Sequence, residues 1–167
     1  MKIGVVVGSD SDLPVLERAF VVWDQYEVPY EVDIISAHRS PEFATEYAAT
    51  AAERGISVIV AAAGLAAHLP GVIAANTVLP VIGLPIGGGP LKGADALYSI
   101  VQMPPGIPVA TVGIDNATNA AYLALHILAL GDERVRRLLV EYRSSLPEKI
   151  VAKNKELRER GLAGFIE

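Results

Sequence analysis

The sequence contains no cysteine among its 167 residues. Disulfide bonds, thiolate nucleophiles and zinc–thiolate sites are therefore excluded, although this absence does not define a cellular compartment. Basic residues are also few, with 14 lysines and arginines against 19 acidic residues, and no basic block occurs. The net charge of −5 therefore argues against nucleic acid as the main partner.

No uninterrupted apolar run reaches the roughly 20 residues that a membrane span requires. The longest apolar region, residues 58–75, is interrupted by two glycines, a histidine and a proline. We interpret it as a buried strand followed by a buried helix. Near the start of the chain, the apolar residues 3–7 are only strand-length and are followed at once by Gly8. We therefore expect no signal peptide, no membrane partner and a cytoplasmic protein.

Apolar residues make up 51% of the chain. One domain is the natural expectation for this length, and so apolar a chain can bury subunit interfaces as well as a core. Short apolar runs alternate five times with helical patterns. The expected strands are residues 2–7, 30–35, 56–62, 79–84 and 108–112. This alternation predicts a three-layer α/β domain with a five-stranded parallel sheet, whose strand order the pattern does not reveal.

The segments between these strands carry the expected helices, with apolar residues spaced three and four apart. We expect Ser11 or Asp12 to cap the first helix and Ser40 to cap the second, because short polar side chains accept hydrogen bonds from free helix amides. The other expected helices span residues 41–54, 94–101 and 116–130, and a further helix of small residues ends near residue 76.

The last part of the chain differs in composition. An apolar stripe that includes Val135 and Leu139 precedes Pro147, and the segment after Pro147 is charged. Because proline interrupts helical hydrogen bonding, we expect a second tail helix to begin at Pro147. Neither helix can bury much alone, so we expect them to pack on the domain or on another subunit. The chain is thus divided into a catalytic domain, residues 1–131, and its helical extension, residues 132–167.

Three loops hold most of the chemically useful side chains, and each follows an expected strand. They are residues 8–12, 36–41 and 64–71. Because ligands bind at the carboxyl ends of strands in open α/β sheets, we expect these loops to meet and form one site. A further loop contains Gly87-Gly88-Gly89. This loop could let its backbone approach a ligand closely, it could act as a mobile lid, or it could be a flexible connection without a role in the site.

Each polar loop also has a plain structural interpretation. Residues 8–12 could bind an anion at a helix start, or merely cap that helix. His38 can exchange a proton near neutral pH, and the guanidinium of Arg39 can donate two hydrogen bonds to a phosphate, but a histidine and an arginine side by side in a loop are often simply solvated. His68 lies in an apolar loop, where a core histidine bonded to backbone is the alternative, and we expect His126 to pack in the core. Neither loop histidine has a ligand partner at helical spacing, so we predict no metal site.

Together these motifs resemble those of the class I 5-(carboxyamino)imidazole ribonucleotide mutases of purine biosynthesis. The resemblance covers about residues 2–130 and rests on GSDSD at 8–12, SAHRSP at 36–41, AAHLPG at 66–71 and LYSIVQMPPGIPVAT at 97–111. It implies a flavodoxin-like fold, a homo-octamer and an active site shared between neighbouring subunits. The implied reaction moves a carboxylate from the exocyclic nitrogen to ring carbon 4 of aminoimidazole ribonucleotide, without ATP, metal or organic cofactor.

The resemblance also implies roles for individual residues. The proton carrier would be a histidine, and the small-molecule ribonucleotide would be held through its phosphate and ribose. The implied catalytic residues are His38 and His68, and the implied substrate-binding residues are Ser9, Asp12, Ser36, Arg39 and Gly64.

Two other functions stay open. One is an aminoimidazole ribonucleotide carboxylase that uses free carbon dioxide, as in the related class II enzymes. Those enzymes have lysine after the loop histidine and lack His-Leu-Pro-Gly, so Arg39 favours class I. The other is a flavodoxin-like nucleotide-binding module without chemistry, which would need neither His38 nor His68.

Two loops depart from the family pattern. Leu65 stands where the family usually has glycine, and Gly87-Gly88 replaces larger polar residues. If the backbone at Leu65 requires a positive φ, leucine is strained there; otherwise its side chain narrows or dries the pocket.

Overall fold

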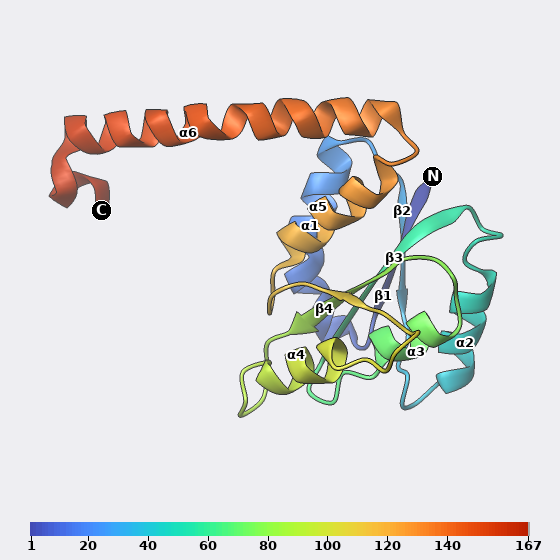
Figure 1. Cartoon of the computed structure of the whole chain (residues 1–167). Helices are drawn as coiled ribbons and strands as arrows, with labels where there is room; N and C mark the ends of the chain where they lie inside the picture. Colours follow the sequence, from blue (N-terminus) through green and yellow to red (C-terminus); the bar gives the residue numbers. More distant parts are fainter. Residues whose placement is uncertain (167) are drawn as a thin grey trace.

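The computed structural model describes residues 1–166, which form a three-layer α/β domain with a projecting C-terminal helix (Figure 1). The five strands are parallel and lie in the order β2-β1-β3-β4-β5. This order is that of flavodoxin-like sheets. The predicted fold class is therefore confirmed. The strands are β1 Lys2–Val7, β2 Tyr30–Ile34, β3 Ile56–Gly64, β4 Val81–Ile86 and β5 Ala110–Thr111.

The central strands are buried on both faces, which explains their continuous apolar sequences. β3 runs two residues further than expected and ends at Gly64, while β4 is shifted towards the carboxyl edge and ends at Ile86. The edge strand β5 is only two residues long, because it pairs with β4 at two positions alone. The expected strand at residues 108–112 was therefore too long.

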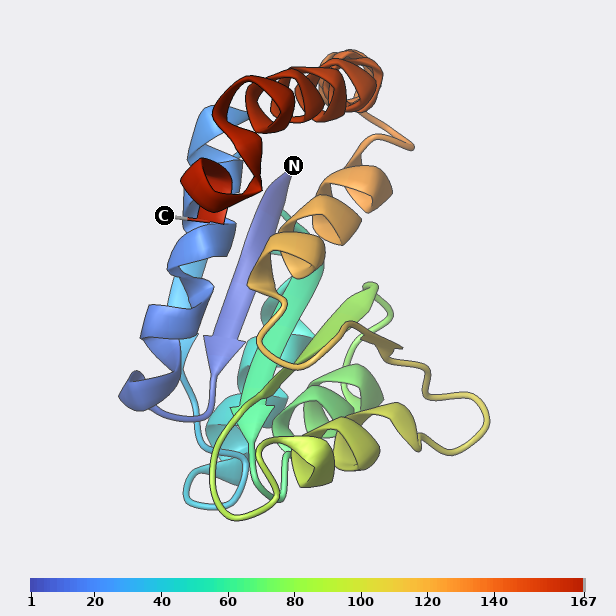
Figure 2. The same ribbon diagram turned by 90° about the vertical axis from the view of Figure 1, so that its left-hand side faces the viewer.

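Helices cover both faces of the sheet (Figures 1 and 2). One face carries α1, α5 and the first turns of α6, and the other carries α2, α3 and α4. Gly83 of β4 lets α4 approach closely, because a Cβ there would collide with Ile100. The helices are α1 Leu13–Gln25, α2 Pro41–Thr50, α3 Leu69–Ala75, α4 Ala94–Val101, α5 Ala117–Leu128 and α6 Glu133–Ile166, with a 3-10 turn at Asp10–Asp12.

The helix caps differ from the expected ones. A 3-10 turn precedes α1, so the first free amide belongs to Ser11. This amide donates a hydrogen bond to the hydroxyl of Ser9 at 3.3 Å. Asp12 stands at the start of α1 without a side-chain capping bond. Ser40 occupies the N-cap position of α2, but its hydroxyl donates to the carbonyl of Ser36 at 3.0 Å. Its side chain therefore closes the preceding loop and does not cap the helix.

Helix α6 is continuous through Pro147, so the expected break at that residue was wrong. Pro147 is exposed, and water can bind the carbonyl that the proline ring leaves without a partner. The break falls at Gly161 instead, where φ is 70° and ψ is 167°. That backbone region is nearly restricted to glycine.

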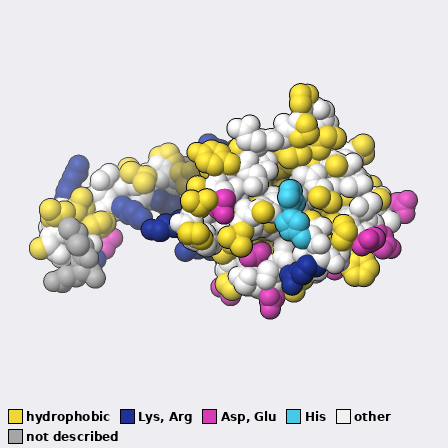
Figure 3. Space-filling view, turned by 90° about the horizontal axis from the view of Figure 1, so that it is seen from below, with side chains coloured by type: hydrophobic (Ala, Val, Ile, Leu, Met, Phe, Trp, Pro, Cys, Tyr) yellow, Lys and Arg dark blue, Asp and Glu magenta, His cyan; other side chains and the backbone are white. Residues whose placement is uncertain are grey.

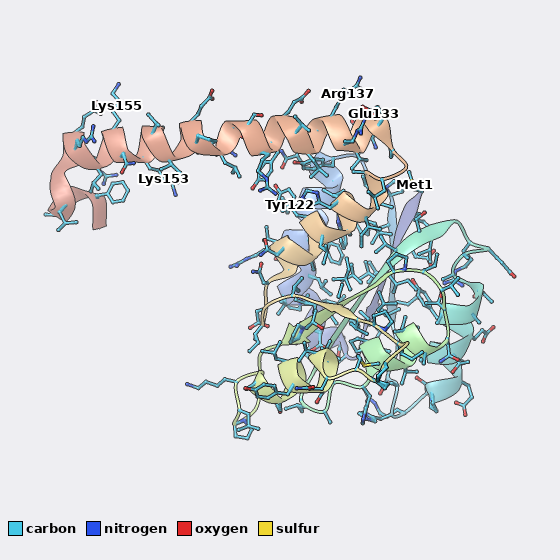
Figure 4. All side chains as sticks on the ribbon, viewed as in Figure 1. Met1, Tyr122, Glu133, Arg137, Lys153 and Lys155 are labelled. Carbon is cyan, nitrogen blue, oxygen red and sulfur yellow. The ribbon has the colours of Figure 1, made fainter. Side chains whose placement is uncertain are left out.

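The first part of α6 packs on the domain. Val135 and Leu139 are buried in the core beneath it, while the outer half projects away (Figure 1). Side chains on that half, including Lys153 and Lys155, extend into open space (Figure 4). No helix of the described residues is both long and apolar enough to span a membrane.

Candidate active site

A cleft of about 740 Å³ opens at the carboxyl edge of the sheet. The loops after β1, β2, β3 and β4 line it, so the three loops expected to meet do meet. Figure 3 looks onto this edge, where histidine side chains lie together near the middle of the face. The lining residues include all seven candidates from the sequence, namely Ser9, Asp12, Ser36, His38, Arg39, Gly64 and His68.

Two histidines from different loops form the centre of the cleft. Nε2 of His38 lies 2.5 Å from Nδ1 of His68, and the ring planes meet at 76°. In such a contact one ring nitrogen donates a hydrogen bond and the other accepts it. His68 is exposed in the cleft, which contradicts the alternative of a core histidine. The backbone positions it, because Leu69 and Pro70 after it are buried at the start of α3.

The guanidinium of Arg39 is oriented by Ser36. The hydroxyl of Ser36 accepts hydrogen bonds from Nε of Arg39 at 3.2 Å and from its backbone amide at 3.3 Å. The loop is closed from the other side, since the amide and the hydroxyl of Ser40 donate to the Ser36 carbonyl. Within the described part of the chain, no ion pair holds Arg39. Arg39 lines the cleft, and its terminal nitrogens carry no hydrogen bond among the described residues, so they are available as donors for an anion.

The first loop brings a buried carboxylate to the cleft. Asp12 is 9% exposed, and the other buried residues of the described chain are apolar. Burial raises the pKa of Asp12, and the negative charge of Asp10 adds to this, against hydrogen bonds from the Ser9 backbone and the Ser11 side chain. A carboxylate with so little water around it gains from a donor such as a hydroxyl group.

The triglycine loop is anchored at its base. The amide of Gly87 donates to Oδ1 of Asp115 at 2.7 Å, and the amide of Asp115 donates to the carbonyl of Pro85 at 2.9 Å. Gly88 has open space around its Cα. Asp115 was not among the residues singled out in the sequence. The only sequence signal was its place beside Asn116 in a polar pair after the last strand.

Leu65 has a left-handed backbone with φ 53°, directly after β3. Of the two alternatives for this position, the strained one is therefore observed. Its carbonyl accepts a hydrogen bond from the amide of Ala67 at 2.9 Å, and the carbonyl of Ala66 accepts one from the amide of His68 at 2.8 Å. These two tight turns reverse the chain and bring the His68 ring to the cleft.

The remaining histidine lies elsewhere. His126 is exposed on α5, beside a cavity of about 350 Å³ between α5 and α6, so the expectation of a core position was wrong. Tyr122, which points towards α6 in Figure 4, stacks on Tyr142 across the same gap. Among the described residues, no three histidine or acidic side chains gather closely enough to hold a metal ion.

The fold and the cleft define a class of protein. A flavodoxin-like sheet carries at its carboxyl edge a pair of histidines, an arginine without an ion pair among the described residues, and a buried carboxylate. Side chains of these types suit the binding of a small anionic molecule and proton exchange with it. The family model described as AIR carboxylase matches residues 2–149. The chain belongs to this family, and the family predicted from the sequence motifs is confirmed.

Relatives with curated names span almost the whole chain. The N5-carboxyaminoimidazole ribonucleotide mutase of Pyrococcus horikoshii is 57% identical, covering 98% of this chain and 93% of its own length. That of Synechocystis sp. is 51% identical, covering 99% of this chain and 94% of its own. The phosphoribosylaminoimidazole carboxylase of Candida glabrata is 48% identical over 99% of this chain, which corresponds to 29% of the longer fungal protein.

A solved structure shows the same fold. PurE of Treponema denticola superposes with a TM-score of 0.82 at 26% identity, and the match covers 93% of this chain and 98% of that protein.

Proposed function

We propose that this chain is an N5-carboxyaminoimidazole ribonucleotide mutase, an isomerase of purine biosynthesis. It would move a carboxylate from the exocyclic nitrogen of aminoimidazole ribonucleotide to ring carbon 4. The observation that carries this proposal is the 2.5 Å contact between the rings of His38 and His68 inside the cleft. Support also comes from relatives named as this mutase, which are 46–57% identical to the chain.

The cleft offers suitable groups for a ribonucleotide. Arg39, oriented by Ser36, would bind the phosphate together with the hydroxyl of Ser9. The buried carboxylate of Asp12 would accept hydrogen bonds from ribose hydroxyls. This division keeps the two negative charges, on the phosphate and on Asp12, apart from each other.

The first half-reaction removes the carboxylate. The bond between the carbamate carbon and the exocyclic nitrogen breaks, its electron pair stays on the nitrogen, and carbon dioxide leaves. His38 donates a proton to that nitrogen, which makes it an amine. His68 would support this transfer, because its Nδ1 forms a hydrogen bond with Nε2 of His38 and so orients the His38 ring.

The second half-reaction forms the carbon–carbon bond. Ring carbon 4 is nucleophilic like an enamine carbon and attacks carbon dioxide, and one electron pair of the C=O bond moves to oxygen to give the carboxylate. His38 then takes the proton from carbon 4, which restores both the aromatic ring and the histidine. Gly64 lines the wall where this step would occur. Every proton and electron pair is balanced within the scheme, and no step is routed through a metal or an organic cofactor.

We further propose a cytoplasmic homo-octamer in which residues 132–167 extend the catalytic domain of residues 1–131. The buried Val135 supports one continuous domain, because it packs in the same core as α1 and α5. The projecting half of α6 supports association with other copies, since Ile150 and Val151 are 60% and 67% exposed there. Sedimentation of the purified protein would measure the assembly, and a monomer would contradict it.

The second candidate is a carboxylase that joins free carbon dioxide to aminoimidazole ribonucleotide. The fungal relatives named phosphoribosylaminoimidazole carboxylase favour this alternative. The same cleft could serve it, because its chemistry is the second half-reaction alone.

A paired assay without ATP or metal distinguishes the two candidates. One sample receives freshly made carbamate substrate and the other receives aminoimidazole ribonucleotide with bicarbonate, both at low bicarbonate. Rapid formation of the carbon-carboxylated product only from the carbamate, and its loss in His38→Asn, supports the mutase. Turnover only in the second sample supports the carboxylase. No product from either, with the protein folded, would leave a nucleotide-binding module, for which retained nucleotide should then be sought.

A further inference from the structure

Leu65 adopts a costly conformation that its own packing does not explain. Its φ of 53° lies in the left-handed region, which glycine and asparagine adopt far more easily than leucine. A buried leucine could offset this strain through apolar contacts, but Leu65 is 55% exposed. Backbone strain that persists at the wall of a reactive cleft points to a role in function.

The Leu65 side chain reaches the triglycine loop on the β4 side of the cleft. A Cβ built on Gly89 would lie 2.7 Å from Cδ2 of Leu65, so the leucine rests directly on the Gly89 backbone. Both residues line the cleft that holds His38 and His68. Gly89 itself has φ 59°, so two left-handed residues from separate loops meet here. An apolar side chain therefore connects the loop after β3 with the loop after β4.

We propose that Leu65 is a gate that retains carbon dioxide in the cleft between the two half-reactions, an inference that rests on the mutase function proposed above. Carbon dioxide is small and uncharged and offers few groups to bind, so enclosure by apolar atoms is the effective way to hold it. The left-handed backbone directs the Leu65 side chain onto Gly89, and the absence of a Cβ at Gly89 leaves room for that contact. Leu65 is thus a specificity-determining residue that favours internal transfer over exchange with solvent.

The test measures how the carboxylate is partitioned and not only how fast product forms. The carbamate substrate is labelled with ¹³C in its carboxylate and converted by the full-length protein in unlabelled bicarbonate, with an enzyme-free sample to subtract spontaneous decay. Mass spectrometry gives the fraction of product that keeps the label, and chromatography gives the aminoimidazole ribonucleotide released per turnover. A purely structural role of Leu65 would change the rate or the melting temperature without changing this partition.

The variants are Leu65→Ala, Leu65→Met and the control Leu91→Ala. Leu91 is another exposed leucine of the loop after β4, but it does not line the cleft. We expect the wild type, Leu65→Met and Leu91→Ala to keep most of the label. Leu65→Ala should release several-fold more aminoimidazole ribonucleotide per turnover and lose label correspondingly.

The outcomes separate this inference from the function on which it rests. If the wild type forms no product from the carbamate, the mutase proposal fails and the gate with it. If the wild type forms labelled product and Leu65→Ala keeps the label equally well, the mutase stands and the gate is refuted. Equal leakage from Leu65→Met and Leu65→Ala would also refute it, because a side chain of similar length should still cover the cleft.

Discussion

Replacing His38 and His68 by asparagine, singly and together, tests whether the two rings act as one proton-transfer unit. Asparagine retains some hydrogen bonding but does not exchange a proton near neutral pH. In the structure the two rings are joined at 2.5 Å, so one nitrogen must donate while the other accepts. Removal of either ring leaves the other without the partner that selects its tautomer.

The expected magnitude follows from this geometry. General acid–base catalysis contributes about 10²–10⁴-fold to a rate, which is about 3–5 kcal/mol of activation free energy. Each single substitution should therefore lower kcat/KM by about 10²–10⁴-fold. Because both substitutions break the same unit, the double variant should lose no more than about tenfold beyond the weaker single variant. Independent groups would instead multiply their losses, to about 10⁴-fold or more.

The assay is kcat/KM for the carbamate substrate at fixed pH, without ATP or metal, on variants shown to be folded by circular dichroism and thermal melting. His126→Asn is the matched control, because His126 is exposed on α5 outside the cleft, and it should leave kcat/KM unchanged. Multiplied losses in the double variant would refute a shared unit, and full activity in His38→Asn would remove that residue from the mechanism.

Three further predictions address the fold and the cleft. Gly83→Ala should lower the free energy of unfolding by about 1–3 kcal/mol in denaturant titration, because the new Cβ collides with Ile100. Asp12→Asn should weaken substrate binding yet stabilise the fold at pH 7. Burial raises the pKa of the Asp12 carboxyl in the folded state, so the folded state is more stable while this carboxyl is protonated and loses that stability as the pH rises through the raised pKa. Asparagine stays neutral at every pH. The difference in the free energy of unfolding between the wild type and Asp12→Asn should therefore vanish below about pH 4, where the carboxyl is protonated in both the folded and the unfolded state. Asp115→Ala should raise KM about fivefold, a loss of about 1 kcal/mol of binding free energy, because the Gly87 amide loses its acceptor. Asp115→Asn keeps an acceptor and should have the KM of the wild type. Equal KM values in the two variants would contradict this role of Asp115.

Much of the architecture could be predicted because it is encoded locally. Continuous β-branched runs such as residues 2–7 are typical of strands buried on both faces, and glycines and prolines mark where they end. The alternation of five such runs with helical patterns leads to a parallel sheet, whose carboxyl edge collects the loops. His38 and Arg39 could be recognised as candidates because they stand together directly after one of these strands.

Features that depend on distant contacts were missed or wrongly predicted. The caps of α1 and α2 depend on a 3-10 turn and on a loop closed by Ser40, and neither is visible in a capping pattern. Pro147 predicted a break, but a helix that is exposed at that point tolerates a proline, and Gly161 provides the break instead. Asp115 acts on Gly87, which lies 28 residues away in the chain.

The sequence by itself determined the α/β class, the five strands, the family and the loops that contain the reactive side chains. The class, the strands and the loops follow because apolar periodicity and turn preferences are properties of neighbouring residues, and the family follows from the resemblance of the loop motifs. Only the tertiary structure decided that His38 and His68, 30 residues apart, share one hydrogen bond, and that Leu65 is held left-handed against Gly89. Those contacts depend on which strands pair and in which register, since pairing places the ends of β2, β3 and β4 at one edge of the sheet.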